Sequence, residues 1–126
     1  MQTPSELRYS SDHEWAKLDG TLVRVGITDY AQDALGDVVF VDLPKVGATL
    51  SVGGVLGEVE STKSVSEIYA PVSGTVSAVN TTLSTSPELV NSDPYGEGWI
   101  CEITTTSSDD FDAMLDATAY EALTTN

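Results

Sequence analysis

Lys63 is the residue of this sequence whose type and surroundings most clearly point to chemistry. It is the only lysine or arginine from residue 46 to the C-terminus, and Glu58, Glu60 and Glu67 flank it. A lysine amine can lose its proton and be acylated, which turns a charged tip into a neutral amide, and arginine lacks this chemistry. The ordinary alternative is a solvated lysine paired with nearby carboxylates, since long charged side chains are normally exposed. The isolation of this base in an acidic chain weakens that alternative.

Two apolar-rich runs on either side of Lys63 are predicted to form the strands that present it. Residues 55–59 and 65–72 are rich in β-branched and aromatic side chains, and glycine and proline residues bound both runs. The small polar residues of segment 61–64 suit a tight reversal between them. We therefore expect a hairpin over about residues 55–74 with Lys63 at its tip.

The segment E-S-T-K-S-V-S-E-I-Y-A-P-V-S-G, residues 60–74, resembles the lipoyl-attachment segment of glycine cleavage system H proteins. In that family the lysine at the position of Lys63 carries lipoic acid in amide linkage. The segment lacks the methionines that flank the lysine of biotin carriers, and the Asp-Lys-Ala turn usual in lipoyl domains of 2-oxoacid dehydrogenases. Glu60 and Gly74 match positions that mark the attachment motif. The resemblance assigns both to recognition by the lipoyl-attaching enzyme, Gly74 through backbone freedom at a bend rather than through a contact.

Composition limits the classes of protein to which this chain can belong. Its 126 residues suffice for one domain with its own core, and a single cysteine, Cys101, excludes an intramolecular disulfide. Cys101 lies in the strand-like run W-I-C-E-I and is expected to be a buried thiol. The N-terminal segment does not resemble a signal peptide, and no apolar run approaches the length of a membrane span. We expect a soluble cytoplasmic protein from a reducing compartment.

The formal net charge of −15 is the strongest compositional feature. It argues against binding of nucleic acids or anionic membranes, which the acidic surface repels. The charge reflects either a docking face for basic partners or adaptation to a salty cytoplasm, in which acidic surfaces stay hydrated and their repulsion is screened. Lysine is scarce and acids lie on every segment, which favours halophilic adaptation. This interpretation predicts a domain that is less stable at low salt.

Many short strands separated by Gly and Pro turns predict an all-β sandwich or barrel with small peripheral helices. In the first part of the chain we expect a hairpin over residues 7–27 that turns at Asp19-Gly20, a helix over 29–35 between the cap Thr28 and Gly36, and a buried strand at 38–41. After the Lys63 hairpin we expect a half-buried strand at 75–79, a helical turn at 86–91 and a strand at 99–103. The chain should end in a helix over about 108–123 that packs on the sheets through its apolar residues Phe111, Met114, Leu115, Ala119, Ala122 and Leu123.

The family resemblance extends over most of the chain. Y-S-S-D-H-E-W is similar to the N-terminal signature of H proteins, V-G-I-T-D-Y-A-Q-D-A-L-G-D-V-V-F-V-D-L-P to a second long block, and D-A-T-A-Y-E-A-L to the closing helix. The resemblance implies a barrel-sandwich hybrid fold with Lys63 at an exposed turn. It also implies that residues 1–126 form a single lipoyl-carrier domain.

The chain itself offers little for catalysis. His13 is the only histidine, so a multi-histidine metal site is excluded and any Ser-His-Asp arrangement must use this residue. There is no Gly-rich phosphate loop, no C-x-x-C pair and no EF-hand spacing, and the acids of segment 109–112 are better explained as a helix start. We therefore expect a carrier without catalytic residues or a metal site.

The resemblance implies that the carrier visits three enzymes of glycine catabolism and one-carbon metabolism. Glycine decarboxylase, a pyridoxal-phosphate enzyme, would load an aminomethyl group onto the lipoyl arm. Aminomethyltransferase would pass the carbon to tetrahydrofolate and release ammonia. Dihydrolipoamide dehydrogenase would then reoxidise the dithiol.

In the family the loaded arm folds into a cleft on the carrier, and the matching positions here are Asp12, Glu14 and Glu67. Carboxylates there would accept charge-assisted hydrogen bonds from the terminal amine, and a drier cleft would slow hydrolysis. Some relatives carry a serine at the position of Asp12 and a histidine at that of Ala34, so this chain departs from them at both positions.

Three alternatives to the shuttle remain open at this level. An H-like protein that mainly relays lipoyl groups to other carriers would have the same Lys63 motif. A small acidic interaction domain would leave the lysine unmodified. An independent hydrolase built on His13 lacks a plausible nucleophile arrangement.

Overall fold

Short antiparallel strands make up most of the regular structure in the computed structural model, which describes residues 2–124. The strands are β1 (Arg8–Tyr9), β2 (Glu14–Asp19), β3 (Leu22–Ile27), β4 (Val38–Asp42), β5 (Thr49–Leu50), β6 (Val55–Ser61), β7 (Val65–Tyr69), β8 (Gly74–Val79) and β9 (Cys101–Thr104). The helices are α1 (Asp29–Leu35), the 3-10 helix η1 (Thr81–Ser84), α2 (Leu89–Ser92), α3 (Asp109–Asp112) and α4 (Ala117–Thr124). No helix among residues 2–124 has the length and apolar character that a membrane crossing requires.

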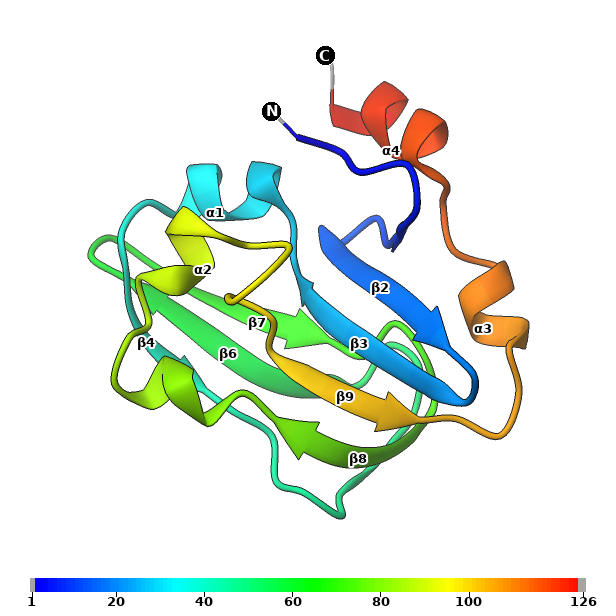
Figure 1. Cartoon of the computed structure of the whole chain (residues 1–126). Coiled ribbons are helices and arrows are strands. Elements are labelled where there is room, and N and C mark those ends of the chain that lie inside the picture. The colour runs from blue at the N-terminus through cyan, green and yellow to red at the C-terminus, as the bar shows by residue number, and fades with distance from the viewer. Residues whose placement is uncertain (1, 125–126) are drawn as a thin grey trace.

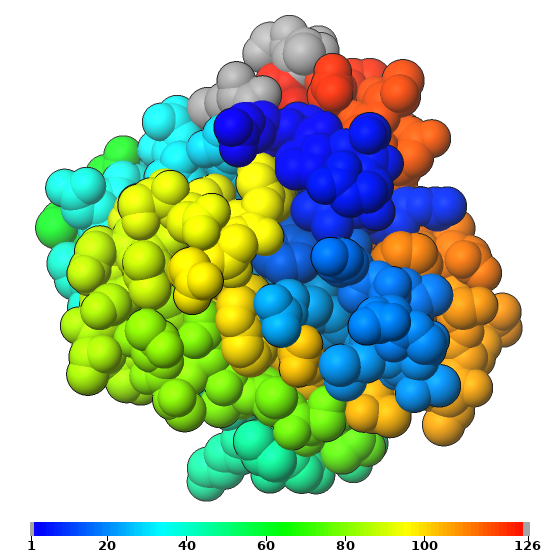
Figure 2. All heavy atoms as spheres, viewed as in Figure 1, coloured from blue at the N-terminus to red at the C-terminus, as the bar shows by residue number. Residues whose placement is uncertain are grey.

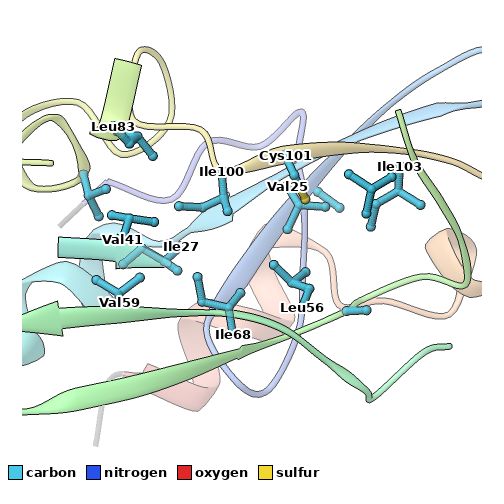
Figure 3. Packing of buried hydrophobic residues seen from close by; sticks show 14 of the residues in the cluster. Val25, Ile27, Val41, Leu56, Val59, Ile68, Leu83, Ile100, Cys101 and Ile103 are labelled. Atoms are coloured by element: carbon cyan, nitrogen blue, oxygen red, sulfur yellow. The ribbon is translucent and has the colours of Figure 1, made fainter. Parts of the chain in front are cut away.

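The strands form two sheets that pack face to face (Figure 1). The larger sheet has the order β1-β2-β3-β9-β8-β5, and the smaller sheet has the order β4-β6-β7. Side chains of β3 and β9, including Val25 and Ile103, point toward Leu56 and Ile68 of the smaller sheet and form the main core (Figure 3). The predicted fold class, all-β and sandwich-like with small peripheral helices, is confirmed.

Cys101 lies within this core and is fully buried, as the strand-like run around it predicted. Burial raises the pKa of its thiol to about 12, and the neighbouring Glu102 carboxylate acts in the same direction. The thiol therefore remains protonated near neutral pH and behaves as a small apolar side chain.

The first helix has the expected bounds, and the predicted N-terminal hairpin is present, although its paired strands span residues 14–27 and its turn lies one residue later than Asp19-Gly20. β2 and β3 pair from Glu14↔Ile27 to Asp19↔Leu22, so the turn consists of Gly20 and Thr21. Thr28 caps α1 by accepting a hydrogen bond from the Ala31 N–H, and Gly36 ends the helix with φ of +85°. Local turn and cap chemistry is enough to determine these boundaries.

A second, smaller core joins the two ends of the chain. It consists of Leu7, Tyr9, Trp15, Ala117 and Tyr120. The Trp15 indole N–H donates to the Pro94 carbonyl at 2.9 Å. The segment before β1 lies beside α4 on the same face of the molecule (Figure 2). The C-terminal helix thus covers the start of the larger sheet.

The prediction that residues 38–41 form a fully buried strand is wrong for half of these residues. Val38 and Val41 are buried, whereas Val39 and Phe40 are 53% and 52% exposed. A register shift between Val38 and Phe40, opposite β6, is the cause. A bulge of this kind adds a residue to one strand, so two neighbouring side chains can both face outward.

The predicted C-terminal helix over 108–123 is present only in part, because the segment forms two short helices. Between α3 and α4 the Leu115 N–H and C=O both bond to the backbone of Tyr9, which interrupts the helix. Phe111 and Met114 pack on the main core as expected. The buried residues of α4 are Ala117 and Tyr120, whereas the predicted contact residues Ala119, Ala122 and Leu123 are exposed.

Candidate functional site

Lys63 lies at the tip of the β6–β7 hairpin, as the flanking apolar runs predicted. The two strands pair from Val55↔Tyr69 to Glu60↔Val65. The Ser61 hydroxyl accepts from the Lys63 and Ser64 N–H groups at 3.2 and 3.0 Å, and the Ser61 N–H donates to the Ser64 carbonyl at 2.8 Å. A serine side chain that bonds backbone groups two and three residues on is a common way to build a tight turn. The lysine is thus mounted on an ordered tip.

The hairpin tip is attached to the end of α1. The Thr62 N–H donates to the Asp37 carbonyl at 3.0 Å. Gly36 leaves room for the lysine stem, because a Cβ added there would lie 3.2 Å from Lys63 Cε. Asn91 of α2 supports the same region by donating to the Gly36 carbonyl and accepting from the Val38 N–H. The position of Lys63 therefore depends on both α1 and α2.

The Lys63 side chain is exposed, and its amine forms no ion pair within residues 2–124. The ion pair found in that part of the chain joins Arg24 to Glu102, at 3.0 Å. Acylation of Lys63 Nζ would therefore break no ion pair of the described residues.

A cleft of about 290 Å³ opens beside this tip and brings the three predicted acids together. Asp12, Glu14 and Glu67 all line it, and Ser64, the neighbour of Lys63, forms part of its rim. One wall comes from the segment leading into β2, a second from α1, and a third from the hairpin. Glu14 is the innermost of the three acids, with 2% of its surface exposed, whereas Asp12 and Glu67 are exposed.

The carboxyl of Glu14 is buried without a cationic partner among residues 2–124. It accepts a hydrogen bond from the Ser10 hydroxyl at 2.6 Å and another from the Tyr69 N–H at 3.1 Å. Burial raises the pKa of Glu14 to about 7, and the nearby Asp12 charge adds to this effect, while the two hydrogen bonds oppose it. The cleft therefore contains a carboxyl that exchanges its proton near neutral pH and that an entering cation would ionise.

Glu67 also belongs to a row of carboxylates that crosses the smaller sheet. Glu58 of β6 lies opposite Glu67 on one side and opposite Asp42 of β4 on the other. Like charges directly opposite each other on neighbouring strands are destabilising. The outer face of the sheet beside the cleft therefore has an unfavourable concentration of negative charge.

Glu60 and Gly74 lie outside the cleft. Glu60 is exposed on β6, next to the tip, and pairs with Val65 and Phe40. Gly74 begins β8, where a Cβ would collide with the Thr104 carbonyl oxygen and the Ile103 side chain. The lack of a side chain at Gly74 thus has a packing cause, and the recognition role expected for both residues stays a prediction.

His13 and Tyr30 complete the cleft, and sequence reasoning did not assign either to it. His13 has φ of +70°, which is uncommon for a residue other than glycine. Its ring lies 4.7 Å from that of Tyr30 on α1, and burial lowers the pKa of the imidazole. The motif His13-Glu14-Trp15 was a signal for the first residue. For α1 the signal was Ala34, the position at which some relatives carry a histidine, and Ala34 lines the cleft.

Comparisons with known proteins extend over nearly the whole chain. Residues 7–126 match the model of a family described as glycine cleavage H-protein. The chain is 58% identical over 127 residues to the glycine cleavage system H protein of Mycobacterium avium strain 104, covering 97% of this chain and 96% of the relative. It is 57% identical over 122 residues to the protein of that name from Escherichia coli O9:H4, covering 95% and 94%.

A solved structure shares the fold. The crystal structure of a glycine cleavage system H protein from Mycobacterium marinum matches with a TM-score of 0.87 and 44% sequence identity, covering 94% of this chain and 96% of the other. The range matched by the family model includes Lys63 and all of the predicted cleft and recognition residues.

Proposed function

Because this chain belongs to the glycine cleavage H-protein family, whose members are non-catalytic carrier subunits, we propose that it carries lipoate on Lys63. In this role it shuttles the aminomethyl group of glycine from glycine decarboxylase to aminomethyltransferase and presents the dithiol to dihydrolipoamide dehydrogenase. The observation that carries the proposal is a lysine, the only basic residue from residue 46 onward, on an ordered, exposed tip whose neighbour Ser64 lines an acidic cleft.

The residues present fit a lipoyl group. Lys63 is exposed, and its amine has no ion pair within residues 2–124. Gly36 has no side chain and so leaves room for the Lys63 stem beside the end of α1. When bound, lipoate supplies a five-membered cyclic disulfide, the redox and group-carrying function that the polypeptide lacks. A tether on this tip raises the local concentration of its reactive end at a docked enzyme.

Glu14 is the residue of the cleft best suited to hold an amine-ended cargo. Its pKa of about 7 reflects a desolvated carboxyl that lacks a cation, so an ammonium group in the cleft would favour the ionised form. The carboxyl would then release its proton and accept a hydrogen bond from the cargo in addition to those from Ser10 and Tyr69. Asp12 and Glu67 are exposed at the rim, so they would also attract the ammonium group while remaining hydrated.

Glu60 is suited to recognition by the lipoyl-attaching enzyme, because it is exposed and lies three residues before Lys63 whether or not the arm is present. Gly74 would contribute to this recognition through the close packing of β8 on β9.

We assign the protein to the cytoplasm and attribute its net charge of −15 to adaptation to salt. The same negative charge would keep the protein from binding nucleic acids and anionic membranes.

The proposal is tested first by the intact mass of the protein from its own cells and by mapping the added lipoyl mass to the Lys63 peptide. A bare lysine there would refute it. The second test is glycine–bicarbonate exchange with glycine decarboxylase, comparing the lipoylated chain with Lys63→Arg. The variant should lose exchange while keeping its melting temperature, because the side chain is exposed. A lipoylated protein that supports no exchange, yet passes its lipoyl group to other carriers, would instead be a lipoyl relay.

A further inference from the structure

A buried chain of hydrogen bonds joins the C-terminal helix to the cleft. The Tyr120 hydroxyl of α4 lies 2.8 Å from His13 Nδ1 and 2.7 Å from Thr28 Oγ1. Thr28 Oγ1 also accepts the Ala31 N–H at 3.1 Å, which caps α1. Tyr120 is 1% exposed and Thr28 is fully buried. One phenol group from the end of the chain thus contacts two segments that lie 15 residues apart.

Both of these segments are walls of the cleft. His13 lines it between Asp12 and Glu14, in the strained turn with φ of +70°. Thr28 begins α1, whose residues Tyr30 and Ala31 line the opposite wall. The backbone joins the two walls here, since the Thr28 N–H donates to the His13 carbonyl at 3.0 Å. The Tyr120 hydroxyl, which lies outside the cleft, adds a link between the side chains of the same two residues.

The phenol is held in place and keeps its proton. The Tyr120 ring stacks on the ring of Tyr9, with centroids 4.7 Å apart and planes at 13°. Burial raises the pKa of Tyr120 to about 12, so the hydroxyl remains a neutral donor and acceptor near neutral pH. A hydroxyl can donate to one neighbour and accept from the other in either direction, so both contacts remain satisfied for either imidazole tautomer of His13.

We propose that Tyr120 is a positioning residue for the cleft, whose hydroxyl holds the His13 imidazole and the Thr28 side chain that caps α1 in place, so that the cleft shields an amine-ended cargo from water. The proposal rests on the carrier function above and assigns a part in it to the C-terminal helix. Loss of the hydroxyl would leave His13 Nδ1 and Thr28 Oγ1 without this partner, so the imidazole and the cap of α1 would be held less rigidly although the backbone still joins the two walls. Water would then reach the cargo more often.

The test compares Tyr120→Phe with Tyr9→Phe in the full chain. Each variant removes one hydroxyl from the same pair of stacked rings, but the Tyr9 hydroxyl donates to the Pro4 carbonyl and has no link to the cleft. The first readout uses protein without lipoate. His13 is the only histidine, so its ring ¹⁵N signals are unambiguous and report the hydrogen bond at Nδ1. Hydrogen exchange of the Ala31 amide reports the cap of α1.

In Tyr120→Phe the ¹⁵N signal of His13 Nδ1 should move, because this nitrogen loses its hydrogen-bond partner, and the Ala31 amide should exchange roughly 2- to 10-fold faster, the range expected for one net hydrogen bond. Tyr9→Phe should change neither. In the loaded, lipoylated chain, Tyr120→Phe should release formaldehyde and ammonia from the aminomethyl cargo faster by a similar factor. Unchanged His13 signals in folded Tyr120→Phe, or equal acceleration of cargo loss in both variants, would overturn the proposal.

A second variant keeps the proposal testable if Tyr120→Phe does not fold. His13→Asn removes the imidazole while retaining a residue that tolerates positive φ. It should speed both Ala31 exchange and cargo loss, and normal values of both would overturn the proposal. Because the signals of unlipoylated protein do not depend on Lys63, a failure of lipoate attachment would refute the carrier function without altering these results.

Discussion

Replacing Glu14 by glutamine should change how the stability of the folded chain depends on pH. The carboxyl is 2% exposed, and burial raises its pKa to about 7 from an ordinary value of 4.5. Since each pKa unit corresponds to about 1.36 kcal/mol, ionising this carboxyl costs about 3 kcal/mol more in the folded than in the unfolded chain. The folded pKa is the higher one, so the stabilising contribution of the protonated carboxyl is complete below pH 4.5 and is lost as the pH rises through 7.

Glutamine has nearly the same shape and can still accept from the Tyr69 N–H, but it does not titrate. Urea unfolding of unlipoylated protein should therefore show that the free energy of unfolding of Glu14→Gln, relative to wild type, rises by about 2–3 kcal/mol between pH 5 and pH 8. Glu60→Gln, which removes an exposed carboxylate from the same hairpin, should follow the wild-type curve. If the Glu14→Gln and wild-type curves run parallel, the buried carboxyl does not titrate near neutral pH and its proposed response to a cation is wrong.

Two further substitutions test the charge and packing arguments. Glu58→Gln interrupts the row of facing carboxylates, so the free energy of unfolding should rise by about 0.2–1 kcal/mol in dilute buffer. This gain should fade in molar salt, where wild type itself should melt at a higher temperature, and equal gains in both conditions would contradict the electrostatic explanation. Gly26→Ala introduces a Cβ 2.5 Å from Trp15 Nε1, and urea denaturation should show a loss of about 1–3 kcal/mol. An unchanged urea midpoint would mean that the indole moves aside freely.

The features that sequence reasoning predicted correctly are those set by short segments. Thr28 and Gly36 bound α1 through cap chemistry that a few residues supply. The Lys63 hairpin likewise needs only two strand-forming runs and a turn built on Ser61. The Gly and Pro turns between short strand-like runs were enough to predict the fold class, because each hairpin is a local unit.

The errors arose where a distant segment determines the backbone. The outward turn of Val39 and Phe40 comes from the register against β6, and an unbroken apolar run contains no sign of it. The break between α3 and α4 comes from pairing of Leu115 with Tyr9, more than a hundred residues away in sequence. The contacts of Tyr120 with His13 and Thr28 likewise join residues about a hundred positions apart, which no local pattern predicts.

Two unfavourable arrangements of charge lie at the site, whereas one acid away from it is paired with a cation. Away from the cleft, Glu102 has an ion pair with Arg24 at 3.0 Å. At the cleft, Glu14 is buried without a cation among residues 2–124, and Glu67 faces the like charge of Glu58. Departures from local electrostatic consistency are expected at functional sites, where a ligand restores the balance. Under the proposed function, an ammonium group in the cleft that Glu14 and Glu67 line would relieve both costs, which favours an amine-ended cargo over a neutral one.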